Sequence, residues 1–112
     1  MTEKKMAKET QEKIQQLQMI QQSMQQFLMQ KQQFQSQLIE VESALEEIEK
    51  TDTAYKIVGS ILVSAKKEDL KKELDEKRNI LNIRIKTLEK QEQQLKDRST
   101  SMQKEVLEEM KK

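Results

Sequence analysis

The chain has 112 residues, of which 37% are charged and only 34% hydrophobic. A compact globular domain of this length needs a larger apolar fraction to fill its core, so the composition argues against that class. Two classes remain, a disordered chain and a long helical assembly. Proline is absent and glycine occurs once, at Gly59, which favours long helices.

The charge and the missing residue types exclude several functions. Twenty-one basic residues balance 20 acidic ones, for a net charge of +1, whereas nucleic-acid binders usually carry a basic surplus. There is no run of about 18 apolar residues, so we expect no membrane span, and the N-terminus lacks the apolar core of a secretory signal. The chain has no cysteine, no histidine and no glycine-rich phosphate loop. We therefore expect no enzyme, no cofactor and no metal, and a cytoplasmic protein.

The first predicted element is a helix over residues 3–50. Two series of positions, each repeating every seven residues, alternate along it, and nine of the ten residues are apolar. The positions are Leu17, Ile20, Met24, Phe27, Lys31, Phe34, Leu38, Val41, Leu45 and Ile48. This 3.5-residue repeat predicts a coiled-coil seam, the strip along which two helices pack. The exception, Lys31, is interpreted as a polar residue that penalises slipped pairings, with Glu92 as its expected ion-pair partner.

The second predicted element is a β-hairpin over residues 54–65. Strands over residues 55–58 and 61–64 are rich in β-branched residues and flank the dipeptide Gly59-Ser60. Glycine in the first position of a two-residue loop predicts a type II′ turn.

The third predicted element is a helix over residues 66–111. It is expected to begin in the region from Ser64 to Lys67, with Glu68 and Asp69 in its first turn. One heptad series is apolar throughout: Leu74, Leu81, Leu88, Leu95 and Met102. The other is partly polar: Arg78, Ile85, Glu92, Ser99 and Val106. Such a seam would make a poor homodimer alone, but it can pair with the richer first helix.

The two repeats fix one antiparallel register. Facing residues, such as Leu17 and Met102, have numbers that add up to 119, and half of 119 falls between Gly59 and Ser60. The repeats alone would also allow a shift of one heptad, but only this register centres the fold-back on the turn at Gly59-Ser60. The predicted fold class is mostly α: a single domain over residues 1–112, in which a β-hairpin links a long antiparallel two-helix coiled coil.

The hairpin is predicted to be an oligomerisation element. A two-stranded hairpin is marginally stable alone, and this one has apolar residues on both faces and two open edges. The residues expected to take part are Tyr55, Ile57, Val58, Gly59, Ile61, Leu62 and Val63.

The order helix, hairpin, helix, with the core Tyr55-Lys56-Ile57-Val58-Gly59-Ser60-Ile61-Leu62-Val63, resembles the β-type subunits of the prefoldin family, in particular the archaeal ones. The resemblance covers essentially the whole chain, and its specific part is the hairpin. It implies a hexamer of two α-type and four β-type subunits whose hairpins join into a β-barrel. It also implies an ATP-independent chaperone that holds unfolded proteins at its coiled-coil tips and passes them to a group II chaperonin.

Apolar residues near the ends of the two helices are the candidates for holding unfolded client proteins. Capture without sequence specificity needs adaptable apolar surface, for which methionine is well suited. The candidates are Met6, Ile14, Leu17, Met102, Val106, Leu107 and Met110. Met102 is also a seam position, where packing against the partner helix is the simpler explanation. Met6, Val106, Leu107 and Met110 are expected to be exposed by fraying of the helix ends.

Two other functions stay open at this point. One is a structural coiled-coil adaptor or scaffold subunit without holding activity. The other is a nucleic-acid-associated helical protein, against which the balanced charge argues.

Overall fold

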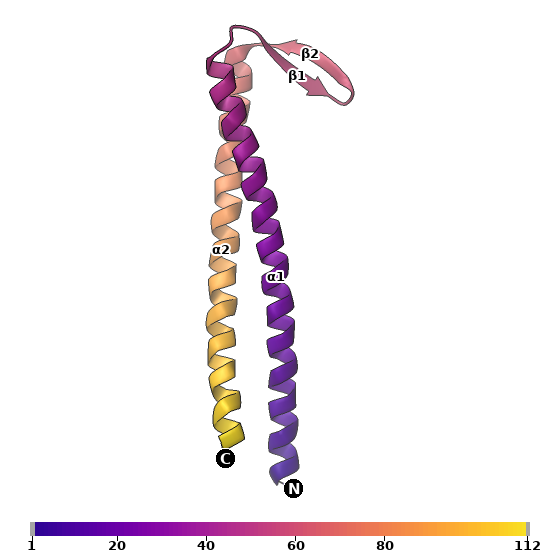
Figure 1. Ribbon diagram of the computed structural model, residues 1–112, viewed down its shortest axis with the longest axis vertical. Coiled ribbons are helices and arrows are strands. Elements are labelled where there is room, and N and C mark those ends of the chain that lie inside the picture. Colours follow the sequence, from indigo (N-terminus) through magenta and orange to yellow (C-terminus); the bar gives the residue numbers. More distant parts are fainter. Residues whose placement is uncertain (1, 112) are drawn as a thin grey trace. The chain divides into compact units, whose positions relative to one another are not determined.

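The computed structural model describes residues 2–111 of the chain, with side chains from residue 8 onward. Helix α1 spans Thr2–Glu49, strand β1 Ala54–Val58, strand β2 Ile61–Ala65 and helix α2 Lys67–Lys111 (Figure 1). The predicted order of elements is confirmed, and the hairpin has the predicted bounds. The helix ends differ from the predicted ones by a single residue.

The chain divides into two compact units. The terminal unit comprises Met1–Lys31 and Thr87–Lys112, and the hairpin unit comprises Gln32–Lys86. In each unit, a segment of α1 lies beside a segment of α2 and runs in the opposite direction (Figure 1). The expectation of a single domain stays a prediction.

The buried side chains follow the predicted heptads in both units. In the hairpin unit the most buried seam residues are Val41, Ile48, Leu81 and Ile85. In the terminal unit the most buried ones are Ile20, Leu88 and Val106. Each of the twenty predicted seam positions is buried or half-buried. The seam residues pack against the facing helix because the 3.5-residue repeat keeps them on one side of their own helix.

The hairpin has the predicted register. Strands β1 and β2 pair antiparallel from Ala54 with Ala65 to Val58 with Ile61, and the numbers of each pair add up to 119. Gly59 has φ of +64° and no non-glycine residue among those described has positive φ. A positive φ at the first loop residue only is the signature of a type II′ turn. Each strand is one residue longer at its base than predicted.

The start of α2 differs from one of the predicted possibilities. Ser64 belongs to β2, and the first helical residue is Lys67. The amide of Leu70 donates to the carbonyl of Lys66 at 3.0 Å, which closes the first turn. Glu68 and Asp69 lie in that turn as expected, where negative side chains stabilise a helix N-terminus.

Candidate functional site: two apolar surfaces

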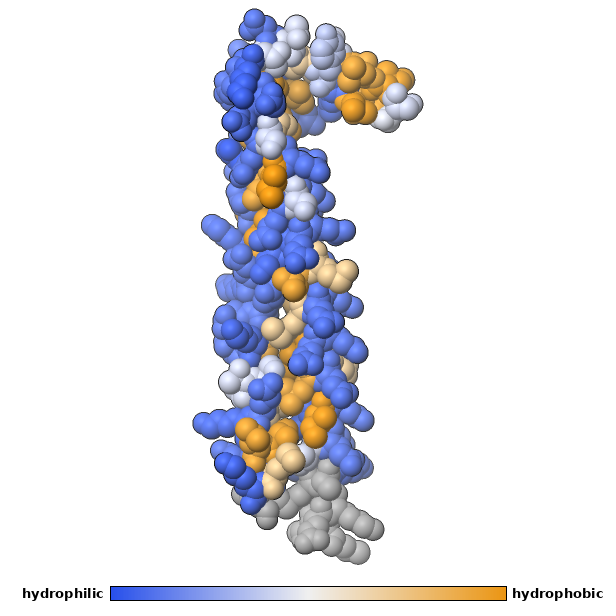
Figure 2. All heavy atoms as spheres, viewed as in Figure 1, coloured by the Kyte–Doolittle hydropathy of each residue, from blue (hydrophilic) through white to orange (hydrophobic). Residues whose placement is uncertain are grey.

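The first candidate surface is the hairpin, whose apolar side chains are exposed. Ile57 is 72% exposed, and Ile61 and Leu62 are each 63% exposed. Figure 2 shows hydrophobic residues gathered on this hairpin. Tyr55, Val58 and Val63 are exposed as well. Burying a side chain of this size stabilises a protein by about 1.5–3 kcal/mol, so the hairpin offers a large apolar surface to a partner.

The exposure includes both faces of the hairpin, because side chains alternate along a strand. Ile57 and its pairing partner Leu62 lie on one face, whereas Val58 and its partner Ile61 lie on the other. A single contact between the hairpin and a helix would cover only one of these faces. The geometry is therefore suited to a hairpin placed between other β-strands or other subunits.

Ion pairs join the hairpin to α2 and α2 to α1 within the hairpin unit. Nζ of Lys56 lies 2.8 Å from Oε1 of Glu73 on α2. An ion pair links Lys71 to Glu49 at the end of α1. The hydrogen bond from Lys71 lowers the pKa of the Glu49 carboxyl below its ordinary value, and the same bond raises the pKa of Lys71.

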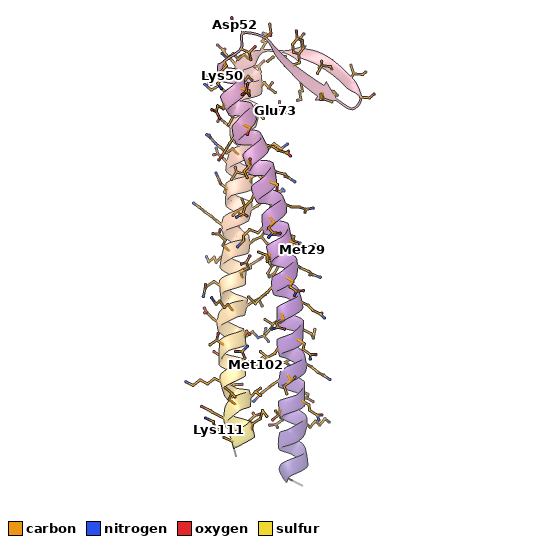
Figure 3. All side chains as sticks on the ribbon, in the orientation of Figure 1. Met29, Lys50, Asp52, Glu73, Met102 and Lys111 are labelled. Atoms are coloured by element: carbon orange, nitrogen blue, oxygen red, sulfur yellow. The ribbon has the colours of Figure 1, made fainter. Side chains whose placement is uncertain are left out.

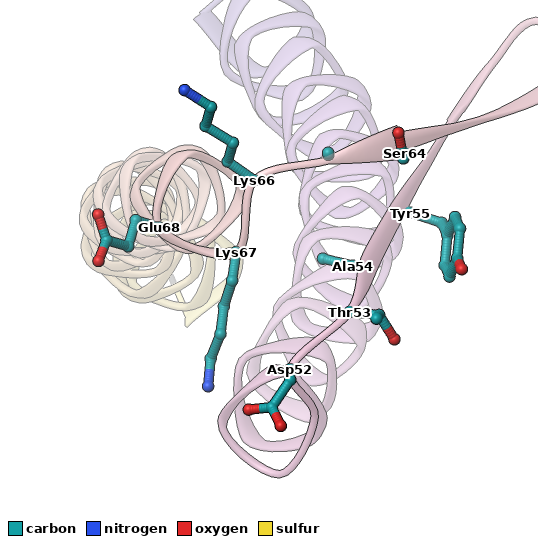
Figure 4. Close-up of a pocket in the computed structure, with 9 residues that line it drawn as sticks. Asp52, Thr53, Ala54, Tyr55, Ser64, Lys66, Lys67 and Glu68 are labelled. Carbon is teal, nitrogen blue, oxygen red and sulfur yellow. The ribbon is translucent and has the colours of Figure 1, made fainter.

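A hollow of about 500 Å³ lies between the base of the hairpin and the first turn of α2. Figure 4 shows its lining residues: Tyr55 and Ser64 lie on the two paired strands, Lys66 follows β2, and Lys67 and Glu68 begin α2. Asp52 and Thr53 precede β1 at its rim. The amide of Thr53 donates to Oγ1 of Thr51 at 3.2 Å, a local turn after the end of α1.

The second candidate surface lies in the terminal unit. Leu107 is 59% exposed and Met110 is 71% exposed. Ile14 is exposed at 40%, whereas Leu17 and Met102 are half-buried in the seam. Figure 3 labels Met102 on α2 and Met29 on α1. The side chain of Met6 lies outside the part of the chain whose side chains the structure describes.

The expected exposure of Val106 is wrong, since this side chain is only 7% exposed. A polar cluster, which we call the clasp, also joins the two helices here: Thr10, Lys13, Glu105 and Glu109. Thr10 donates to Glu109 at 2.7 Å, and Lys13 forms ion pairs with both glutamates. The hydrogen bond to Glu109 raises the pKa of Lys13 above its ordinary value of 10.5.

The sequence contained a signal for the clasp that the prediction did not use. Extending the heptads by seven residues from Leu17, Ile20 and Met102 gives Thr10, Lys13 and Glu109. These positions are polar and their charges are complementary, so the seam continues with ion pairs where its apolar residues end.

The predicted ion pair inside the seam is confirmed. Nζ of Lys31 lies 3.2 Å from both carboxylate oxygens of Glu92. Their side chains are only 18% and 22% exposed. Removing either partner alone would leave a poorly hydrated charge, which costs more than the pair contributes. This pair therefore penalises any register in which the two residues do not meet.

Within residues 2–111, neither helix combines the length with the apolar character that a membrane span needs. Among residues 8–111, whose side chains the structure describes, no three acidic side chains are grouped closely enough to hold a metal ion.

The fold and the two surfaces define a class of proteins: coiled-coil subunits whose helices are linked by a hairpin. Residues 11–112 match the family model described as prefoldin subunit. Over 101 residues, the chain is 42% identical to prefoldin subunit beta of Archaeoglobus fulgidus, an alignment that covers 88% of this chain and 87% of the relative. The chain belongs to the prefoldin subunit family.

Two further relatives agree with this assignment. The chain is 51% identical to prefoldin subunit beta of Methanococcus aeolicus over 51 residues. That alignment covers 46% of this chain and 44% of the relative. The crystal structure of the prefoldin beta subunit from Thermococcus strain KS-1 superposes with a TM-score of 0.82 at 35% identity. That superposition covers 88% of this chain and 89% of the Thermococcus chain. The predicted resemblance to archaeal β-type subunits is thus confirmed.

Proposed function

We propose that this chain is a β-type subunit of an ATP-independent holding chaperone. It captures unfolded proteins with apolar residues of the terminal unit and passes them to a group II chaperonin. Membership of the prefoldin subunit family supports this function. The function needs no catalytic group and no cofactor, and it belongs in the cytoplasm, where newly made chains and chaperonins meet.

The proposed assembly is a hexamer of two α-type and four β-type subunits whose hairpins join into a β-barrel. The exposure of apolar side chains on both faces of the hairpin supports it. Neighbouring strands would satisfy the open strand edges and cover both faces at once.

The observation that carries the capture proposal is the contrast between neighbours at the end of α2. Val106 is buried in the seam, while Leu107 and Met110 are 59% and 71% exposed. Because these two side chains are mostly exposed, replacing them with serine removes little packing between the helices. They are therefore available to a client, and the flexible methionine adapts to clients of different shapes.

The test is suppression of aggregation by the reconstituted assembly. The chain is mixed with a two-hairpin α-type subunit, and an unfolded protein is diluted into the complex. We expect the wild-type assembly to delay aggregation and the variant Leu107→Ser/Met110→Ser to lose most of that delay. Ile80→Ser/Ile83→Ser is the matched control, since these residues have the same spacing on α2, are 51% and 64% exposed, and lie in the hairpin unit.

A wild-type assembly that forms but does not delay aggregation would contradict the holding function and favour a structural adaptor. Equal loss of the delay in both variants would contradict capture by the terminal unit.

A further inference from the structure

The seam of the terminal unit contains a small polar residue where a large apolar one would fill it. Ser99 occupies a heptad position of α2 and is half-buried. On one flank of the seam at this point, a groove of about 470 Å³ opens between the helices. Gln21, Met24 and Gln25 line it from α1, and Lys96, Ser99 and Gln103 line it from α2.

The groove combines hydrogen-bonding groups with an apolar patch. Each of its glutamine amides carries both donors and an acceptor, and the half-buried Met24 supplies apolar surface. Thr100 also lines the groove, but its hydroxyl donates to the carbonyl of Lys96 at 2.9 Å within α2. Lys96 is the only charged residue lining the groove, and there is no carboxylate.

The α1 side of the groove belongs to a long uncharged stretch. Residues 14–30 include no charged residue, although solvated helix faces usually carry many charges. Ile14, Gln21 and Leu28 are seven residues apart and so share one flank of α1. Ile14 and Leu28 are 40% and 46% exposed and lie on either side of the groove along this flank.

Such a surface is suited to an extended polypeptide. An extended chain presents backbone N–H and C=O groups that lose water on binding and need partners, which the glutamine amides can provide. The flank from Ile14 to Leu28 is about 21 Å long at 1.5 Å per residue. About six residues of extended chain span that length.

We propose that this groove and the uncharged flank of α1 bind an extended segment of unfolded protein that is neutral or acidic. Lys96 attracts carboxylates and repels lysine or arginine. No side chain lining the groove offers a negative charge that would attract a basic residue. The inference rests on the proposed holding function and adds to it a second contact region, with a preference in charge.

The test uses the reconstituted assembly and two labelled unfolded peptides that differ only in carrying aspartates or lysines. At low ionic strength we expect the wild-type assembly to bind the aspartate peptide about two- to fivefold more tightly. The variant Gln21→Glu/Gln25→Glu keeps side-chain size and helix propensity but makes the groove acidic. We expect it to cancel or reverse the preference.

The matched control is Gln33→Glu/Gln37→Glu. It makes the same change at the same spacing on α1, at two exposed positions in the hairpin unit. We expect this variant to keep the wild-type preference. Either an unchanged preference in the groove variant or an equal shift in the control would overturn the inference.

The proposed function and the inference fail in different ways. If the wild-type assembly delays aggregation but shows no preference for the aspartate peptide, only the inference is wrong. If it neither delays aggregation nor binds either peptide, the holding function itself is wrong. A change in the native mass of the groove variant would show that the groove packs against another subunit, which also overturns the inference.

Discussion

The two units use similar helix pairs but expose different apolar residues. The hairpin unit exposes β-branched and leucine side chains on two paired strands and isoleucines on its helices, whereas most of the large apolar side chains exposed in the terminal unit are methionines and leucines. All seven methionines of the chain fall within the terminal unit. β-branched side chains are stiff and favour one fixed partner, whereas methionine adapts to many. In the proposed function, assembly and capture therefore use different kinds of apolar surface.

The largest effect is expected from placing charges on the hairpin. Val58→Asp/Leu62→Asp puts a carboxylate on each face, where the proposed partners would bury it. Because each lost apolar contact costs about 1.5–3 kcal/mol and the buried charges cost more, we expect the assembly to dissociate. The native mass with an α-type subunit measures this.

The reciprocal variant sharpens the comparison. Met19→Asp/Met29→Asp changes side chains that are 66% and 68% exposed in the terminal unit, and we expect the native mass to stay that of the assembly. Dissociation of this variant, or survival of the hairpin variant, would contradict the division of roles between the units.

An intermediate effect is expected from two neighbours in α2. Val106→Ala removes methyl groups from a side chain that is 7% exposed, and we expect it to destabilise the helix pair of the terminal unit by about 1–3 kcal/mol. Leu107→Ala should change that stability by less than about 0.5 kcal/mol and should weaken client holding. Hydrogen exchange of the α2 amides near residue 106 measures the first effect. Equal protection in the two variants would contradict the assignment of Val106 to the seam.

The smallest effect is expected from the exposed ion pair between Glu49 and Lys71 in the hairpin unit. The pKa of Glu49 is lowered in the folded protein, so the pair stabilises the protein above the ordinary carboxyl pKa. This contribution is lost as the pH falls through the lowered value. Glu49→Gln should therefore lower the melting temperature slightly at neutral pH and leave it unchanged in strong acid. A pH-independent difference would contradict this linkage.

Much of the fold could be predicted because local patterns agreed with one another. The heptads and the turn at Gly59-Ser60 together favoured one register, and the pairing of β1 with β2 and the ion pair between Lys31 and Glu92 agree with it. Such agreement across levels is what allows one sequence to specify one structure.

The candidate capture surface was harder to predict because exposure depends on contacts between helices. Val106 was expected to be exposed, but it is buried in the seam beside the clasp. The size of the groove beside Met24 depends on how completely side chains fill the seam around Ser99. A heptad pattern gives the position of a residue but not the space around it.

The distribution of methionine has a chemical consequence for the protein under oxidative conditions. Peroxide converts methionine to the sulfoxide, a polar side chain that methionine sulfoxide reductases can restore. Met19, Met29 and Met110 are all more than 60% exposed, whereas residues 32–86 contain no methionine and the chain has no cysteine. Oxidation would therefore make the terminal unit more polar and leave the hairpin chemically unchanged, and repair by a reductase would reverse it without any need to reassemble the subunits.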